Sequence, residues 1–174
     1  MKLRQIKIEF VPEQDRVLLS VSTDDAKEVL LHLTRRCVKR LWPVLMGMAG
    51  SSPSVAVQRS PEARAAMVGF QHERALQAAD FSQPYAQGSR EHPLGSEPIL
   101  AAKIQTRRDE SGNHVVTLLP MRGAGIHLTL DEPLLHSFCK LLQDAVAKAE
   151  WDLVLQLPQP LGPAPESGEV RTIN

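Results

Sequence analysis

The sequence predicts an α+β fold in which two antiparallel βββα halves pack as one body, joined by an irregular connector that carries one helix. Two patterns predict this fold. Near the N-terminus, apolar residues recur with a period of two in three successive segments, and a helical period follows. The same succession returns towards the C-terminus, where IHLT at 126–129 repeats LHLT at 31–34 almost letter for letter.

The composition is that of a globular protein with an aliphatic core. Of 174 residues, 43% are apolar and 23% charged, but only 4% are aromatic. A chain of this length forms about one domain and buries enough surface to fold without metals or disulfides. Twenty basic residues balance twenty acidic ones. This balance argues against a protein dedicated to nucleic acid or to a membrane surface.

Localisation and cofactors follow from what the sequence lacks. Its two cysteines are too few for a disulfide framework, and no metal-binding spacing surrounds them. The first ten residues, MKLRQIKIEF, contain no apolar run of the kind found in secretory signals. We therefore expect a cytoplasmic protein with no cofactor, no metal and no membrane contact.

Residues 1–50 predict the first half. The alternating apolar positions are Ile6, Ile8 and Phe10, then Val17, Leu19 and Val21, then Val29, Leu31 and Leu33. Polar turn-like connections make an antiparallel meander the simplest arrangement of these strands. Thr34 is the expected N-cap of a helix whose apolar positions are Val38, Leu41, Trp42, Leu45 and Met48. Pro43 is expected to kink or divide this helix.

Residues 51–98 form a connector rich in Ser, Pro and Gln. Within it a helix is expected at about 61–80, capped by Ser60, with a weak apolar stripe at Ala63, Ala66, Met67 and Phe70. Met67 and Phe70 are its only large anchors, so we expect the helix to dock through them, on its own body or on a partner subunit. The flanks have the composition of mobile, protease-sensitive segments.

Residues 99–157 predict the second half. Three strands are expected in PILAAKIQT, HVVTLLP and IHLTL, followed by a helix capped by Asp131. The apolar stripe of this helix is Leu135, Phe138, Leu142, Ala145 and Ala149. Residues 158–174 are rich in Pro and Gly, and we expect a frayed tail.

The two halves align as an internal duplication of a βββα unit. Ile8 aligns with Ile104, Val17 with Val115, and His32 with His127. Chance similarity is the alternative, because short strands are built from the same few residue types. The halves could lay sheet on sheet or join as one six-stranded sheet. In either case His32 and His127 occupy equivalent positions, either as a paired site or as two residues of half-exposed sheet faces.

The sharpest candidate site is the cluster TRRCVKRLW at 34–42. Arg35, Arg36, Lys39 and Arg40 lie on one side of the helix, with Trp42 a turn away. Four cations suit phosphate binding, and an aromatic neighbour could stack on a base. Placed in the first half of the helix, the cations oppose its dipole and so do not serve helix stability. A solvated face, ion pairs or a protein partner are the alternatives.

Cys37 lies among these cations, which would favour its thiolate form. No catalytic signature surrounds it in the sequence. The alternative is a small, semi-buried helix residue.

The order of elements is similar to two known architectures. One is the duplicated strand-rich repeat of the Pur-type and Whirly single-strand nucleic-acid binders. The other is the head domain of end-joining scaffold proteins, in which a strand meander and a helical insertion precede more strands and a long dimerising helix. The chain departs from the first in its neutral charge and few aromatics, and from the second in its short final helix.

No catalytic motif is present, so we expect a non-enzymatic binding or scaffolding module. Strand edges and helix stripes offer surfaces for self-association, and a homodimer is expected. The alternative is binding of single-stranded nucleic acid or a phosphate ligand through residues 35–40; nucleic acid is possible but not favoured.

Overall fold

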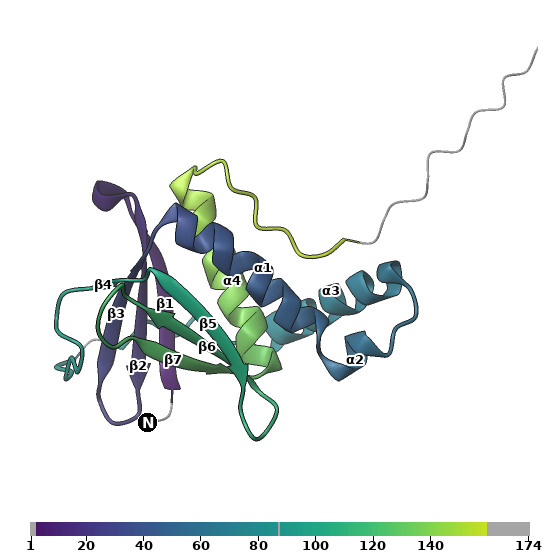
Figure 1. Ribbon diagram of the computed structural model, residues 1–174, viewed down its shortest axis with the longest axis horizontal. Helices are drawn as coiled ribbons and strands as arrows, with labels where there is room; N and C mark the ends of the chain where they lie inside the picture. Colours follow the sequence, from purple (N-terminus) through teal and green to yellow (C-terminus); the bar gives the residue numbers. More distant parts are fainter. Residues whose placement is uncertain (1–2, 87, 160–174) are drawn as a thin grey trace, which may run out of the picture.

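Two sheets and four α-helices form the part of the protein that the computed structural model describes, residues 3–86 and 88–159 (Figure 1). The first half contains β1 (Leu3–Val11), a 3-10 turn (Pro12–Gln14), β2 (Arg16–Thr23), β3 (Glu28–Leu33) and α1 (Arg35–Gly50). The connector contains α2 (Pro53–Ala56) and α3 (Pro61–Ala78). The second half contains β4 (Ile99–Leu100), β5 (Lys103–Arg108), β6 (His114–Leu119), β7 (Ile126–Leu130) and α4 (Glu132–Ala149). The α+β class is therefore confirmed.

The first sheet has the order β1-β2-β3-β4, and β1 to β3 form the predicted antiparallel meander. Ile8 lies opposite Leu19, and Leu19 lies opposite Leu31. All three belong to the hydrophobic core, as the alternating pattern indicates. The short β4 adds in parallel beside β3.

A single extended segment passes from the first sheet to the second at Ala101 and Ala102. The Ala101 amide donates to the His32 carbonyl at 3.0 Å, and the Ala102 amide donates to the Leu119 carbonyl at 2.8 Å. Beyond this point β5 pairs with β6, and β6 with β7, as a separate antiparallel sheet. The halves thus form two sheets, and β5 lies at an edge of the second.

α1 begins where the sequence predicts, with the Thr34 side chain accepting a hydrogen bond from the Cys37 amide at 3.1 Å. Its five predicted apolar residues are all buried. The helix runs unbroken from Arg35 to Gly50, so the prediction that Pro43 divides it is wrong. Pro43 lies on the exposed side, and so does Lys39, whose carbonyl loses its helical partner. Water can solvate that carbonyl, which makes proline tolerable there.

α4 connects the two halves into one body. Asp131 caps it by accepting from the Leu134 amide, and its buried face contains most of the predicted stripe. The helix packs against β1 of the other half and against α3. Just past its end, Trp151 makes an edge-on contact with Phe10 at 5.9 Å between ring centroids and donates to the Asp15 carboxylate at 2.5 Å.

α3 is confirmed nearly over its predicted length, with Ser60 as its cap, but the predicted stripe is not the face it buries. The buried residues are Ala65, Val68, Gln71, His72 and Ala75. Met67 is partly buried against the core, whereas Phe70 is 58% exposed. Polar contacts with α4 favour the observed face, because Gln71 donates to Glu132 and His72 faces His136.

The second flank of the connector lies against the first sheet. The Arg90 guanidinium pairs with the Glu28 carboxylate at 2.8 Å, and the Tyr85 hydroxyl donates to the same carboxylate at 2.6 Å. Backbone bonds join Glu91 to Ala26 and Glu28. Tyr85, Arg90 and Glu91 are thus tied to the first sheet at Ala26 and Glu28. The predicted tail, 158–174, lies outside the described residues from 160 onwards.

Candidate anion-binding groove

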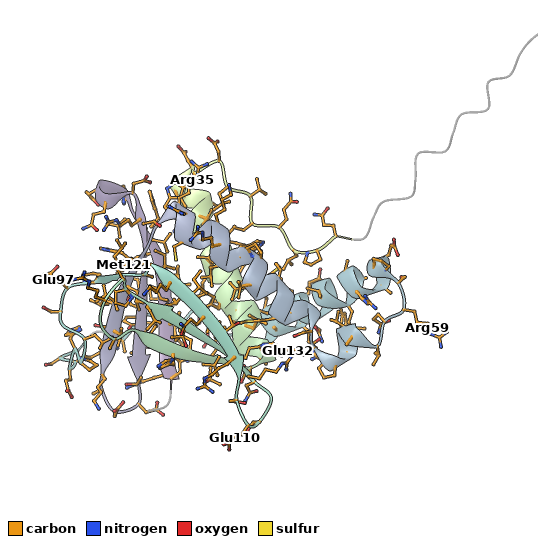
Figure 2. The ribbon with its side chains drawn as sticks, viewed as in Figure 1. Arg35, Arg59, Glu97, Glu110, Met121 and Glu132 are labelled. Carbon is orange, nitrogen blue, oxygen red and sulfur yellow. The ribbon has the colours of Figure 1, made fainter. Side chains whose placement is uncertain are left out.

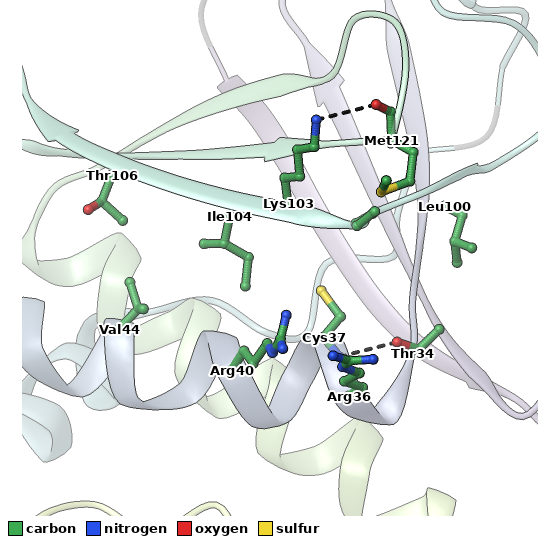
Figure 3. Close-up of a pocket in the computed structure, with 12 residues that line it drawn as sticks. Thr34, Arg36, Cys37, Arg40, Val44, Leu100, Lys103, Ile104, Thr106 and Met121 are labelled. Atoms are coloured by element: carbon green, nitrogen blue, oxygen red, sulfur yellow. Dashed lines mark hydrogen bonds between the residues drawn. The ribbon is translucent and has the colours of Figure 1, made fainter.

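A groove of about 740 Å³ separates α1 from the segment that runs through β4 into β5 (Figure 3). It opens at the point where that segment leaves the first sheet, because β5 turns away from β3 towards β6. One wall is the N-terminal half of α1, and the other is formed by residues 100–104 with Thr106. The sheet split and the helix cap at Thr34 together position this site.

The floor of the groove is apolar and its helix wall is basic. Val44 of α1 and Ile104 of β5 point towards one another, and Cys37 lies beside them (Figure 3). Arg36 and Arg40, one helical turn apart, line the helix wall. They are exposed, which leaves their guanidinium groups accessible to a ligand.

Within the described residues, the groove has no acidic lining residue to balance these cations. Lys103 belongs to the opposite wall, but its side chain points to the far side of β5 from α1, where its ammonium group donates to the Met121 carbonyl at 3.3 Å (Figure 3). None of these three cations forms a salt bridge within residues 3–86 and 88–159. The groove therefore offers the two guanidinium groups of Arg36 and Arg40 beside an apolar floor.

The structure divides the predicted cluster. Arg36 and Arg40 line the groove, whereas Arg35 and Lys39 are exposed beside it, and Figure 2 shows Arg35 at the beginning of α1. Trp42 is only 7% exposed, and its indole nitrogen donates to the Gln156 carbonyl at 3.0 Å. Its ring is therefore part of the core and is not presented for stacking on a base.

Sequence reasoning missed the second wall of the groove. Lys103, Ile104 and Thr106 belong to β5, KIQTRR, and for this part of the chain the sequence predicts only the strand PILAAKIQT. One feature of the sequence indicates that this strand lies at an edge. KIQTRR is polar at most positions, whereas HVVTLL is apolar at most positions. Such a difference is typical of an edge strand beside a central one.

Cys37 does not behave as the flanking cations suggest. Burial raises the pKa of its thiol to about 11, and the opposing influence of Arg40 is smaller. At neutral pH the side chain is a protonated thiol on the floor of the groove. It packs as a small apolar residue.

The two histidines of the repeated tetrapeptide lie in different sheets and different surroundings. His32 is buried in β3, where burial and then Arg16 lower its pKa. His127 is exposed on β7, with its Nδ1 atom 2.7 Å from the Thr117 hydroxyl. A different pair does meet: the Nδ1 atoms of His72 and His136 lie 3.2 Å apart between α3 and α4.

Two features are absent from the described residues. No helix there is long and apolar enough to cross a lipid bilayer. No group of three or more His, Cys, Asp or Glu side chains in that part of the chain is placed to hold a metal ion.

Comparison with known proteins does not assign a function to the groove. No protein-family model matches the chain, and neither a curated protein nor a solved structure matches it.

Proposed function

We propose that the protein is a non-enzymatic binding module whose ligand is anionic and occupies the groove between α1 and β5. The observation that carries the proposal is the pair of cations, Arg36 and Arg40, beside a groove with no acidic residue among its described lining. Charge-assisted hydrogen bonds to carboxylate or phosphate oxygens are the strong interactions available to such groups.

The lining also favours binding over catalysis. The groove's nucleophilic side chain is Cys37, and the raised pKa of its thiol makes it a poor attacking group at neutral pH. The remaining lining side chains are apolar, cationic or hydroxyl-bearing.

The proposal is tested with simple polyanions. Polyglutamate, inorganic polyphosphate and single-stranded DNA are titrated into the full chain at low salt. We expect at least one polyanion to bind. Its affinity should fall roughly tenfold or more between about 50 and about 200 mM salt, because the basic side chains of the protein displace counterions from the polyanion. The test variant is Arg36→Glu with Arg40→Glu. The matched control is Arg35→Glu with Lys39→Glu, which makes the same charge change outside the groove.

Binding should be lost in the groove variant and largely kept in the control. If both variants lose binding equally, the ligand recognises the general charge of α1 and the groove is not the site. If no polyanion binds the parent at low salt, the proposal fails.

Self-association is a second proposal, favoured by one side chain. Phe70 projects from α3 with 58% of its surface exposed, and Val57 nearby in the sequence is 73% exposed. Burying such side chains against a second copy would stabilise a dimer. Light scattering over a range of concentrations should show a dimer that Phe70→Ser abolishes, and a monomer throughout would refute the idea.

The internal duplication and the cytoplasmic location stay predictions. For the duplication, support is limited to the order of elements, because each half contains a three-stranded meander followed by a long helix.

A further inference from the structure

β5 is an edge strand whose outer side faces the groove region. In the described part of the chain it pairs only with β6, so the backbone groups on its other side have no strand partner. Its residues are exposed except for Ile104, which is half-buried. An unpaired strand edge is a template to which another extended chain can add.

The groove between α1 and β5 lies beside this strand edge and provides a surface that such a chain could contact. α1 passes beneath β5, and Figure 3 shows Val44, Arg40 and Cys37 projecting from the helix towards the strand. The groove volume of about 740 Å³ falls in the range of ligand-binding pockets. The floor can therefore accept apolar side chains while the strand edge accepts a backbone.

A second copy of this chain is a poor occupant. Pairing β5 with β5 would bring Lys103, Arg107 and Arg108 of both copies into one ladder. Like charges opposite one another destabilise a strand pair. Two basic edges therefore repel each other, and the occupant should carry negative charge.

Nucleic acid is also disfavoured. Single strands are held by aromatic side chains that stack on successive bases. The described groove lining contains no aromatic residue, and Trp42 is buried in the core. A polypeptide with acidic residues satisfies the open strand edge, the apolar floor and the cations together.

We propose that the α1–β5 groove binds an acidic segment of a partner protein in extended conformation, which adds to the outer edge of β5 as a further strand. The inference rests on the proposed function and names its ligand. Side chains alternate across a strand, so the set that faces α1 meets Val44 and Ile104 as well as Arg36 and Arg40, and this set must contain both apolar side chains and carboxylates.

The probe is a dye-labelled peptide that repeats valine-valine-glutamate-glutamate, so that each face of the extended chain carries both residue types, and its binding to the full chain is followed by fluorescence anisotropy. Two further peptides carry N-methyl groups on alternate backbone nitrogens, one in the odd register and one in the even register. In a strand at an edge, alternate N–H groups face the protein and the others face away. One methylated register should lose affinity by about tenfold or more, and the other should bind nearly as the parent peptide does.

The protein variants test the charges separately. Arg36→Glu with Arg40→Glu should weaken the unmodified peptide by at least about tenfold, because two charge-assisted bonds become repulsive contacts. Arg35→Glu with Lys39→Glu should change the affinity for this peptide by less than about threefold, as expected for screened surface charges. Amide chemical-shift changes should centre on residues 100–106 and on residues 36–44.

The outcomes separate this inference from the proposed function. If polyphosphate or DNA binds through Arg36 and Arg40 while the peptide does not, the anion site stands and the peptide ligand is refuted. If both methylated registers bind equally well, strand addition is refuted even though the peptide binds. If neither the peptide nor any polyanion binds, both proposals fall.

Discussion

At the scale of the residue, Gly125 is required by close packing. A Cβ atom there would lie 2.0 Å from the Leu118 carbonyl oxygen, which belongs to the backbone of β6 and cannot rotate away. Gly47, on the exposed side of α1, has nothing within 4 Å of the same position. The two glycines therefore predict opposite responses to an added methyl group.

Gly125→Ala should lower the free energy of unfolding by about 2–3 kcal/mol, because the β6–β7 turn must move to relieve the clash. Gly47→Ala should raise it by about 0.5–1 kcal/mol, since alanine loses less backbone entropy in a helix than glycine does. Urea denaturation measures both changes. A Gly125→Ala variant as stable as the parent would contradict the packing at this turn.

The buried histidine pair predicts an acid-sensitive fold. His136 is fully buried, and burial together with the neighbouring His72 lowers its pKa to about 4. Burial also lowers the pKa of His72, with Lys140 adding to the effect and Glu73 opposing it. Between about pH 6.5 and pH 4 the unfolded chain binds protons that the folded protein rejects, so stability is complete above this window and falls as the pH drops through it.

Lowering the pH from 7.5 to 5 should therefore remove about 2 kcal/mol through His136. His136→Phe should flatten the dependence whatever its effect on stability at pH 7.5. His127→Gln, at an exposed position, should keep the slope of the parent. Urea denaturation at several pH values gives these slopes, and equal slopes in all three proteins would contradict the role of the pair.

At the scale of the element, α3 separates a residue that packs from one that does not. Met67 packs partly against the core and Phe70 is mostly exposed, although the sequence presents them as one stripe. Met67→Ser should lower the protection of residues 61–78 against hydrogen exchange, because it removes apolar contact with the body. Phe70→Ser should leave that protection unchanged in dilute protein. Loss of protection in Phe70→Ser alone would indicate that α3 is held by another subunit.

The difference between strong and weak periodicity explains how far the sequence could predict the elements. β2, β3 and α1 bury the residues that their alternation and helical spacing indicate, because large aliphatic side chains dominate those patterns, and in β1 Ile8 is buried while Ile6 and Phe10 pack partly buried against the core. In α3 the buried face includes Gln71 and His72, whose burial depends on Glu132 and His136 in α4. Such partners lie far away in the sequence, so local spacing could not identify them.

The candidate site shows the same limit. The cations of α1 were visible in TRRCVKRLW, but which two line a groove depends on where β5 passes. That path is fixed by the switch of partners at Ala101 and Ala102, a tertiary event with no local signature. The burial of Trp42, by contrast, could be predicted from the sequence. Trp42 belongs to the apolar stripe of α1 and is buried with it, although it lies close to the cations in the sequence.

At the scale of the whole molecule, one carboxylate joins the connector to the first sheet, in addition to the backbone bonds of Glu91. Glu28 of β3 accepts from Arg90 and from Tyr85, more than fifty residues away, and the Arg90 guanidinium also lies over the Tyr85 ring. The side chains of Glu28 and Arg90 are only 15% and 9% exposed. Burial, and then the bond to Glu28, raises the pKa of Tyr85 to about 12, so its hydroxyl remains a donor at physiological pH.

Glu28→Gln should release this segment, because it leaves the Arg90 charge buried without its partner, at a cost on the order of 3 kcal/mol. Hydrogen exchange over residues 85–92 should accelerate, and proteases should cut there. Asp144→Asn is the control, because it removes a surface pair with Lys140 whose side chains are 52% and 40% exposed. That pair should contribute less than about 1 kcal/mol.

Anion binding in the groove provides a second measurement on the Glu28→Gln variant. Residues 93–98 lead from the tied segment into β4, but the wall formed by β5 is held independently by its ladder with β6. Glu28→Gln should therefore loosen the connector and leave anion binding within about threefold of the parent, a change of less than 1 kcal/mol. A large loss of binding would mean that the first sheet and the connector together hold the groove open, and that the split at Ala101 is not sufficient to form it.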